Sequence, residues 1–129
     1  MDVMLQQRLA ILLAAGEIDE PIREAVVAFG AALEEKFGLE LGEENAAMFV
    51  THLAMALARI RRGEEVDGLD EAALAELAEM PAYRELPALY QGLERRLRIV
   101  IPETEQNYIT LHACVLVAKR KNERGGEDH

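Results

Sequence analysis

Residues 43–62, EENAAMFVTHLAMALARIRR, carry the clearest structural signal in the chain. Two acids open this segment, where a helix dipole favours negative charge, and arginines close it. Between Ala46 and Ile60 nearly every side chain is apolar, so apolar residues cover most of the circumference of a helix. The segment therefore predicts a helix that is buried on several sides.

Apolar residues at helical spacing recur on both sides of this segment. Asp19-Glu20-Pro21 is typical of a helix N-terminus, and Gly38 is typical of a helix end. Ile99-Val100-Ile101 could form a strand, but the chain offers no second strand to pair with it. We expect helices over residues 5–16, 19–38, 43–62, 70–80, 83–98 and 102–121.

These elements predict an all-α fold, a compact bundle of five to six helices. The length of 129 residues matches one domain and leaves no room for a second independent core. We expect a single domain over residues 1–122, followed by a disordered tail at 123–129.

The charge and cysteine content narrow the possible partners. Fourteen basic residues against 24 acidic residues give a net charge of −10, which repels phosphate backbones and anionic lipid. We therefore expect no direct binding of nucleic acid or membrane. Cys114 is the single cysteine, so the chain can form no internal disulfide and no zinc site of several thiolates. No signal-peptide or membrane-spanning pattern occurs, and we expect a cytoplasmic protein with a buried thiol.

Two histidines lie at the middle of polar stripes on predicted helices. Asn45 and Arg59 each lie seven residues from His52, and seven residues is close to two helical turns. The three side chains therefore share one face, within about 20° of each other. The last helix repeats the arrangement, with Glu105 seven residues before His112. Each stripe predicts a groove, an interface or an internally satisfied network.

Other chemistry is less well supported by the residues. The chain has no glycine-rich phosphate loop and no nucleophile elbow, and it lacks the His-Glu-x-x-His and Cys-x-x-Cys patterns. Two histidines with Glu105 could imitate a carboxylate-bridged metal site, but Glu-x-x-His spacing is absent. Cys114 lies about 160° around the helix from His112, which favours a small core residue over a catalytic thiol. The residues alone leave two roles open for His52 and His112: a functional one and a purely structural one.

Residues 101–112, IPETEQNYITLH, resemble the hallmark segment of the PTS regulation domain (PRD). That domain occurs in antiterminators and activators controlled by the sugar phosphotransferase system. The second half of the family pattern, a histidine followed seven residues later by arginine, matches His52 and Arg59. The resemblance covers roughly residues 5–120. Within the hallmark segment, the matching positions are Pro102, Glu103, Glu105, Tyr108, Ile109, Leu111 and His112.

The resemblance implies a five-helix bundle, commonly dimeric, that is a regulatory module and not an enzyme. It implies that His52 and His112 accept a phosphoryl group from phospho-HPr or from a sugar-specific enzyme II component. Arg59, Glu105 and Asn45 would support these histidines, and neither a metal nor a cofactor would be required.

We therefore expect a stand-alone PRD protein, a homodimer whose association or partner binding changes on phosphorylation. It would act in trans on a regulator protein in the transcriptional control of sugar use. The alternative is a constitutive helical interaction module with structural histidines that is never phosphorylated. If both stripes serve one switch, their helices should pack together and bring both histidines to one groove. Glu105 or Asn45 should then lie near an imidazole, with Arg59 at the rim.

Overall fold

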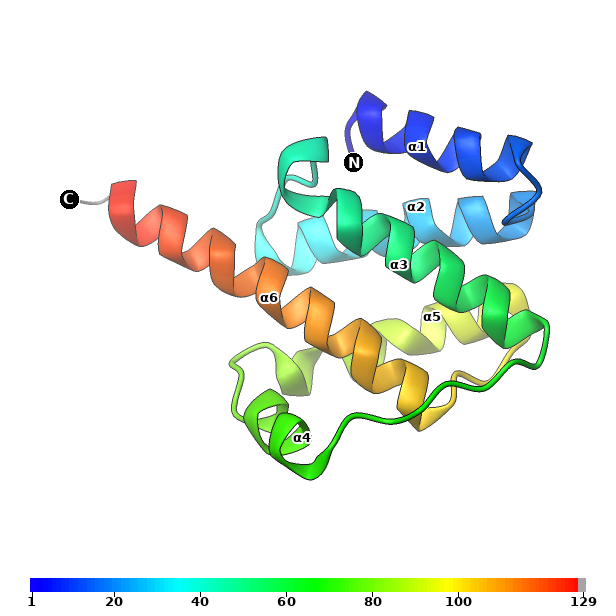
Figure 1. The fold of residues 1–129 in the computed structure, drawn as a ribbon. Helices are drawn as coiled ribbons and strands as arrows, with labels where there is room; N and C mark the ends of the chain where they lie inside the picture. The colour runs from blue at the N-terminus through cyan, green and yellow to red at the C-terminus, as the bar shows by residue number, and fades with distance from the viewer. Residues whose placement is uncertain (128–129) are drawn as a thin grey trace.

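A computed structural model describes residues 1–127 of the chain, and the side chains of residues 1–119. This range forms six α-helices and one short 3-10 helix, with no strand among the described residues (Figure 1). The predicted all-α helical bundle is confirmed. The elements are α1 (Val3–Ala14), α2 (Glu20–Phe37), α3 (Glu43–Arg61), α4 (Glu71–Ala78), η1 (Tyr83–Glu85), α5 (Pro87–Leu97) and α6 (Glu103–Glu127).

Helix α3 lies at the centre of the packing. It contacts α1 and α2 on one side and α6 on another, while α5 packs on α2 and α4 packs on α6 (Figure 1). Contacts with these three helices explain why α3 is apolar around most of its circumference, as its sequence predicted. Helix α6 runs in roughly the opposite direction to α3 (Figure 1). The buried side chains of α3 are Ala46, Phe49, Val50, Leu53, Ala54, Ala56, Leu57 and Ala58.

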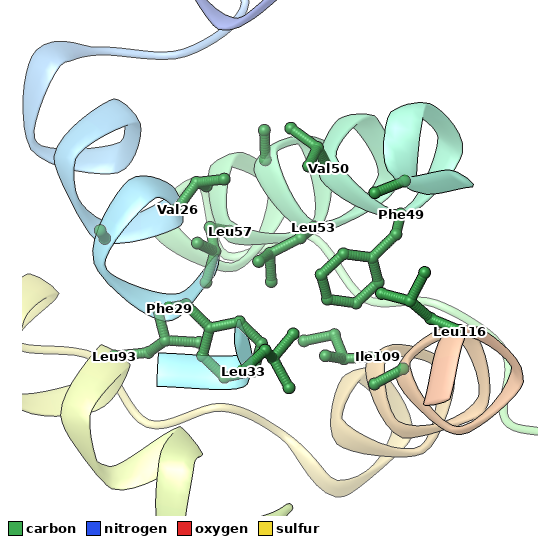
Figure 2. Packing of buried hydrophobic residues seen from close by; sticks show 14 of the residues in the cluster. Val26, Phe29, Leu33, Phe49, Val50, Leu53, Leu57, Leu93, Ile109 and Leu116 are labelled. Atoms are coloured by element: carbon green, nitrogen blue, oxygen red, sulfur yellow. The ribbon is translucent and has the colours of Figure 1, made fainter. Parts of the chain in front are cut away.

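A row of aromatic rings crosses the core and joins three helices, and a hydrogen bond extends it to a fourth. Phe49 of α3 stacks on Phe29 of α2 with ring centroids 6.2 Å apart, and Phe29 stacks on Tyr90 of α5 at 5.9 Å. The buried Tyr90 hydroxyl shares a 2.5 Å hydrogen bond with the Thr110 hydroxyl of α6. Figure 2 shows Phe49 reaching from α3 toward α6, beside Leu116. The wall between α3 and α6 is therefore part of the main core.

Local signals at the helix ends explain most of the boundaries. Asp19 accepts a hydrogen bond from the Ile22 backbone N–H at the start of α2, and Pro21 follows in its first turn. Gly38 ends α2 in the left-handed conformation, with φ +65°. Arg98 ends α5 with φ +54°, and it is the one non-glycine residue with positive φ among those described.

Two predicted boundaries were wrong. The helix expected over 83–98 is divided into η1 and α5, because Pro87 takes the first turn of a new helix, where its missing N–H leaves no bond unmade. The last helix was expected to end among residues 119–121. Instead α6 continues to Glu127, and residues 128–129 lie outside the described residues. No helix in the described part of the chain is both long and apolar enough to span a bilayer.

Candidate functional site

His52 of α3 and His112 of α6 lie face to face. Their ring centroids are 4.7 Å apart and the ring planes differ by 9°, so the imidazoles stack. His52 is exposed and His112 is half-buried. The predicted packing of the two helices, with both histidines at one groove, is confirmed.

The histidines border a cavity of about 240 Å³ between α3 and α6, the histidine groove. Apolar side chains form most of its walls, and the ionisable side chains lie on both helices. The lining residues are Phe49, His52, Leu53, Ala56, Arg59, Glu105, Tyr108, Ile109 and His112. Among the apolar residues, Phe49, Ala56 and Ile109 line this groove, whereas Leu116 lines an adjoining hollow.

An ion pair crosses the histidine groove. Arg59 donates from Nε to one Glu105 carboxylate oxygen at 3.3 Å and from Nη2 to the other at 3.1 Å. The Glu105 side chain is 1% exposed and that of Arg59 is 32% exposed. The sequence predicted Glu105 or Asn45 near an imidazole; Glu105 lines the same groove as both histidines, and its carboxylate bonds to Arg59. A buried carboxylate needs such a partner, because desolvation strongly penalises an unpaired charge.

Asn45 lies at the N-terminus of α3 and not in the histidine groove. Its amide oxygen accepts the Gly42 N–H at 2.8 Å, and its amide nitrogen donates to the Glu40 carbonyl at 3.1 Å. The amide therefore holds the start of the helix. Asn45 borders the adjoining hollow, which is also lined by Met48, Phe49, His112, Val115, Leu116 and Lys119. A supporting role beside a histidine stays a prediction.

One helical register explains both placements. Because α3 and α6 run in opposite directions with the histidines aligned, the residue seven positions after His52 faces the residue seven positions before His112. This register pairs Arg59 with Glu105. It also brings Asn45 and Lys119 to the adjoining hollow at the opposite end. The Arg59–Glu105 pair was not predicted, although the opposite charges at matching distances from the two histidines indicate it.

The environment favours a neutral imidazole at His112. Burial, followed by the charge of neighbouring His52, lowers the pKa of His112 below its ordinary value. A neutral imidazole has one nitrogen with a free lone pair, which makes it a nucleophile.

Cys114 does not line the histidine groove. Cys114 is 2% exposed in the core, and burial raises the pKa of its thiol to about 11. The sequence prediction of a small core residue is therefore confirmed. Among the described residues, no group of three or more His, Cys, Asp or Glu side chains is arranged to hold a metal ion.

The fold and the paired histidines define a helical-bundle module with a histidine groove, and comparison with known proteins shows its family. The family model described as "PRD domain" matches residues 29–113, which include α3, both histidines and the Arg59–Glu105 pair. The chain belongs to the PRD domain family.

Two bacterial relatives have similar length. "Uncharacterized protein YhfY" of Escherichia coli K12 is 34% identical over 105 residues, which cover 81% of this chain and 88% of that protein. An "uncharacterized protein" of Haemophilus influenzae is 26% identical over 106 residues, which cover 81% of this chain and 85% of that protein. No solved structure matches the chain.

Proposed function

We propose that this module accepts a phosphoryl group on His52 or His112, from phospho-HPr or from an enzyme II component of the sugar phosphotransferase system. The observation that carries the proposal is the stacked histidine pair at the mouth of a groove that also contains a guanidinium. Nucleophilic imidazole and a nearby cation are the two features that phosphoryl acceptance requires.

The transfer needs no metal or nucleotide on the acceptor side. The lone pair of a neutral imidazole attacks the phosphorus of the donor phosphohistidine. The new nitrogen–phosphorus bond forms as the donor bond breaks. The donor ring keeps its other N–H proton and leaves as neutral imidazole, while the acceptor becomes an N-phosphorylated imidazolium. Lowering the pKa of His112 supports this step, because it keeps the attacking ring unprotonated at neutral pH.

Arg59 supplies the positive charge for the product. Its Nε and Nη2 atoms bond to Glu105, which fixes the plane of the guanidinium and leaves Nη1 without a partner among the described residues. A phosphoryl group on a groove histidine carries nearly two negative charges. The free N–H groups of Arg59 can therefore bond to it without breaking the ion pair.

Phosphorylation would change the charge of the surface beside His112, and so the binding of a partner. Met48 is 70% exposed and Val115 is 40% exposed, and both border the hollow beside His112. Adding charge between them converts a largely apolar patch into an anionic one. We propose that this controls homodimerisation, or binding in trans to a regulator of sugar-use genes.

Reconstituted phosphotransfer tests the proposal. Incubation with phosphoenolpyruvate, enzyme I and HPr, or with the enzyme II component in addition, should add phosphoryl mass measured under alkaline conditions. The His52→Asn/His112→Asn variant should stay unlabelled. The third histidine provides a matched control, because His129→Asn keeps both groove histidines and should be labelled like the wild type. No added mass from either donor, with a competent control acceptor labelled, would contradict the proposal.

A specific observation also fits the alternative of a constitutive interaction module. The two imidazoles stack on each other among apolar side chains where α3 meets α6. In that case the histidine pair completes the α3–α6 interface and serves only packing. The wild type and the double asparagine variant would then show the same sedimentation coefficient before and after incubation with donors.

A further inference from the structure

The stacking of the two imidazoles limits how many phosphoryl groups the histidine groove can carry. We propose that His52 and His112 form a single acceptor, in which a phosphoryl group on either ring prevents phosphorylation of the other. This inference concerns the stoichiometry of the same site, so its physiological meaning rests on the proposed function.

The geometry places the two acceptor positions together. With ring centroids 4.7 Å apart and nearly parallel planes, a phosphoryl group on either ring lies beside the other ring. Two such groups would lie too close for solvent ions to screen them fully, because the screening length at physiological salt is about 8 Å.

The charges around the groove suit one phosphoryl group and not two. Arg59 is the single cation among the lining residues, and Glu105 already neutralises part of its charge. The remaining polar lining residue, Tyr108, contributes a phenol hydroxyl, which carries no positive charge. A first phosphoryl group meets Arg59, whereas a second would meet the first group and the Glu105 carboxylate.

Lys119 is an additional cation close to His112. It borders the adjoining hollow that His112 also lines, and it is exposed. An exposed ammonium is well solvated and interacts weakly, so it does not replace a second cation inside the groove. If His52 and His112 form one acceptor, two donors that approach this module compete for one position.

Chemical phosphorylation tests the stoichiometry without any partner protein. Phosphoramidate transfers its phosphoryl group to imidazole: its own phosphorus–nitrogen bond breaks, the ring loses one proton, and ammonium leaves. The experiment uses the His129→Asn chain, which contains only the two groove histidines. At saturation we expect one added phosphoryl group on the folded chain and two on the chain unfolded in urea, by mass measurement at alkaline pH.

Two single variants distinguish exclusion from inaccessibility. In the same background, folded His52→Asn and His112→Asn chains should each accept one group, because either ring alone can react. Two groups on the folded parent chain, or no group on either single variant, would overturn the inference. Failure of the proposed function has a different signature: one group from phosphoramidate but none from phospho-HPr or enzyme II.

Discussion

Glu105 is the one charged side chain that is fully buried among the described residues, and Arg59 is its partner. Removing a carboxylate from water is expensive, and the attraction to a guanidinium offsets that loss only while both groups are present. The buried Glu105 carboxylate therefore requires Arg59 as its partner. The pair as a whole adds no net stability.

Replacing Arg59 should therefore destabilise the protein. Arg59→Met should lower the free energy of unfolding by about 3 kcal/mol, because it leaves the buried Glu105 carboxylate unpaired. Urea denaturation followed by circular dichroism measures the change. Arg59→Met/Glu105→Met should recover most of the loss, since two apolar side chains replace the pair.

Arg61 on the same helix is the matched control for this prediction. Its ion pair with Asp19, at 2.6 Å, joins side chains that are 37% and 50% exposed. Arg61→Met should therefore lower the free energy of unfolding by less than about 1 kcal/mol. Equal losses for Arg59→Met and Arg61→Met would contradict the assignment of Glu105 as a buried charge.

His112 should make the protein less stable in mild acid. Burial and neighbouring His52 lower the pKa of His112 in the folded state, so the unfolded chain takes up a proton first as the pH falls. The neutral ring therefore makes its full contribution to the free energy of unfolding above about pH 6.5, the ordinary histidine pKa. This contribution declines as the pH falls below that value.

Urea midpoints measured between pH 8 and pH 5 check this dependence. His112→Asn should show a smaller decrease on acidification than the wild type. His129→Asn keeps both groove histidines and should follow the wild type. A decrease that is the same in all three proteins would show that His112 is not its source.

At the scale of the helix, the end of α5 is conformationally strained. Arg98 adopts φ +54° and ψ +49°, a left-handed conformation that a side chain with Cβ disfavours and glycine tolerates. Arg98→Gly should therefore raise the free energy of unfolding by up to about 1 kcal/mol. Arg96→Gly, inside the same helix, should lower it by about 0.5–1 kcal/mol. Thermal denaturation measures both, and a change of the same sign would contradict the argument.

Helix boundaries could be predicted wherever a local group determines them. Asp19 and Gly38 bound α2 through their own hydrogen bonds and backbone angles, so the sequence was sufficient. The division between η1 and α5 at Pro87 was not predicted, because an apolar pattern at helical spacing continues across that proline.

The positions of the site residues depend on how distant parts of the chain pack together. Spacing of seven residues predicted that each histidine shares a face with its neighbours. Whether His52 would face His112 depended on the direction and register of α3 against α6, and these follow from the packing of the whole bundle. Asn45 shows the limit: it lies on the correct face, but its amide is used to begin the helix.

At the scale of the molecule, the charge of −10 should prevent binding to nucleic acid. Phosphate backbones attract proteins mainly through lysine and arginine, and this chain would repel them. We expect no retained complex with RNA or duplex DNA in gel-shift experiments at physiological salt, before or after phosphorylation. Submicromolar binding under these conditions would contradict the prediction.

The tyrosine residues give the histidine groove an optical signal of its own. The chain has no tryptophan and three tyrosines, so its ultraviolet emission comes from phenol rings alone. Tyr108 lines the groove together with both imidazoles. Tyr90 is buried in the core, and its hydroxyl is hydrogen-bonded to Thr110. A dianion added to the groove alters the surroundings of Tyr108 and leaves Tyr90 unchanged. The part of the emission that is present in the wild type and absent in Tyr108→Phe therefore reports on the groove, and no dye has to be attached.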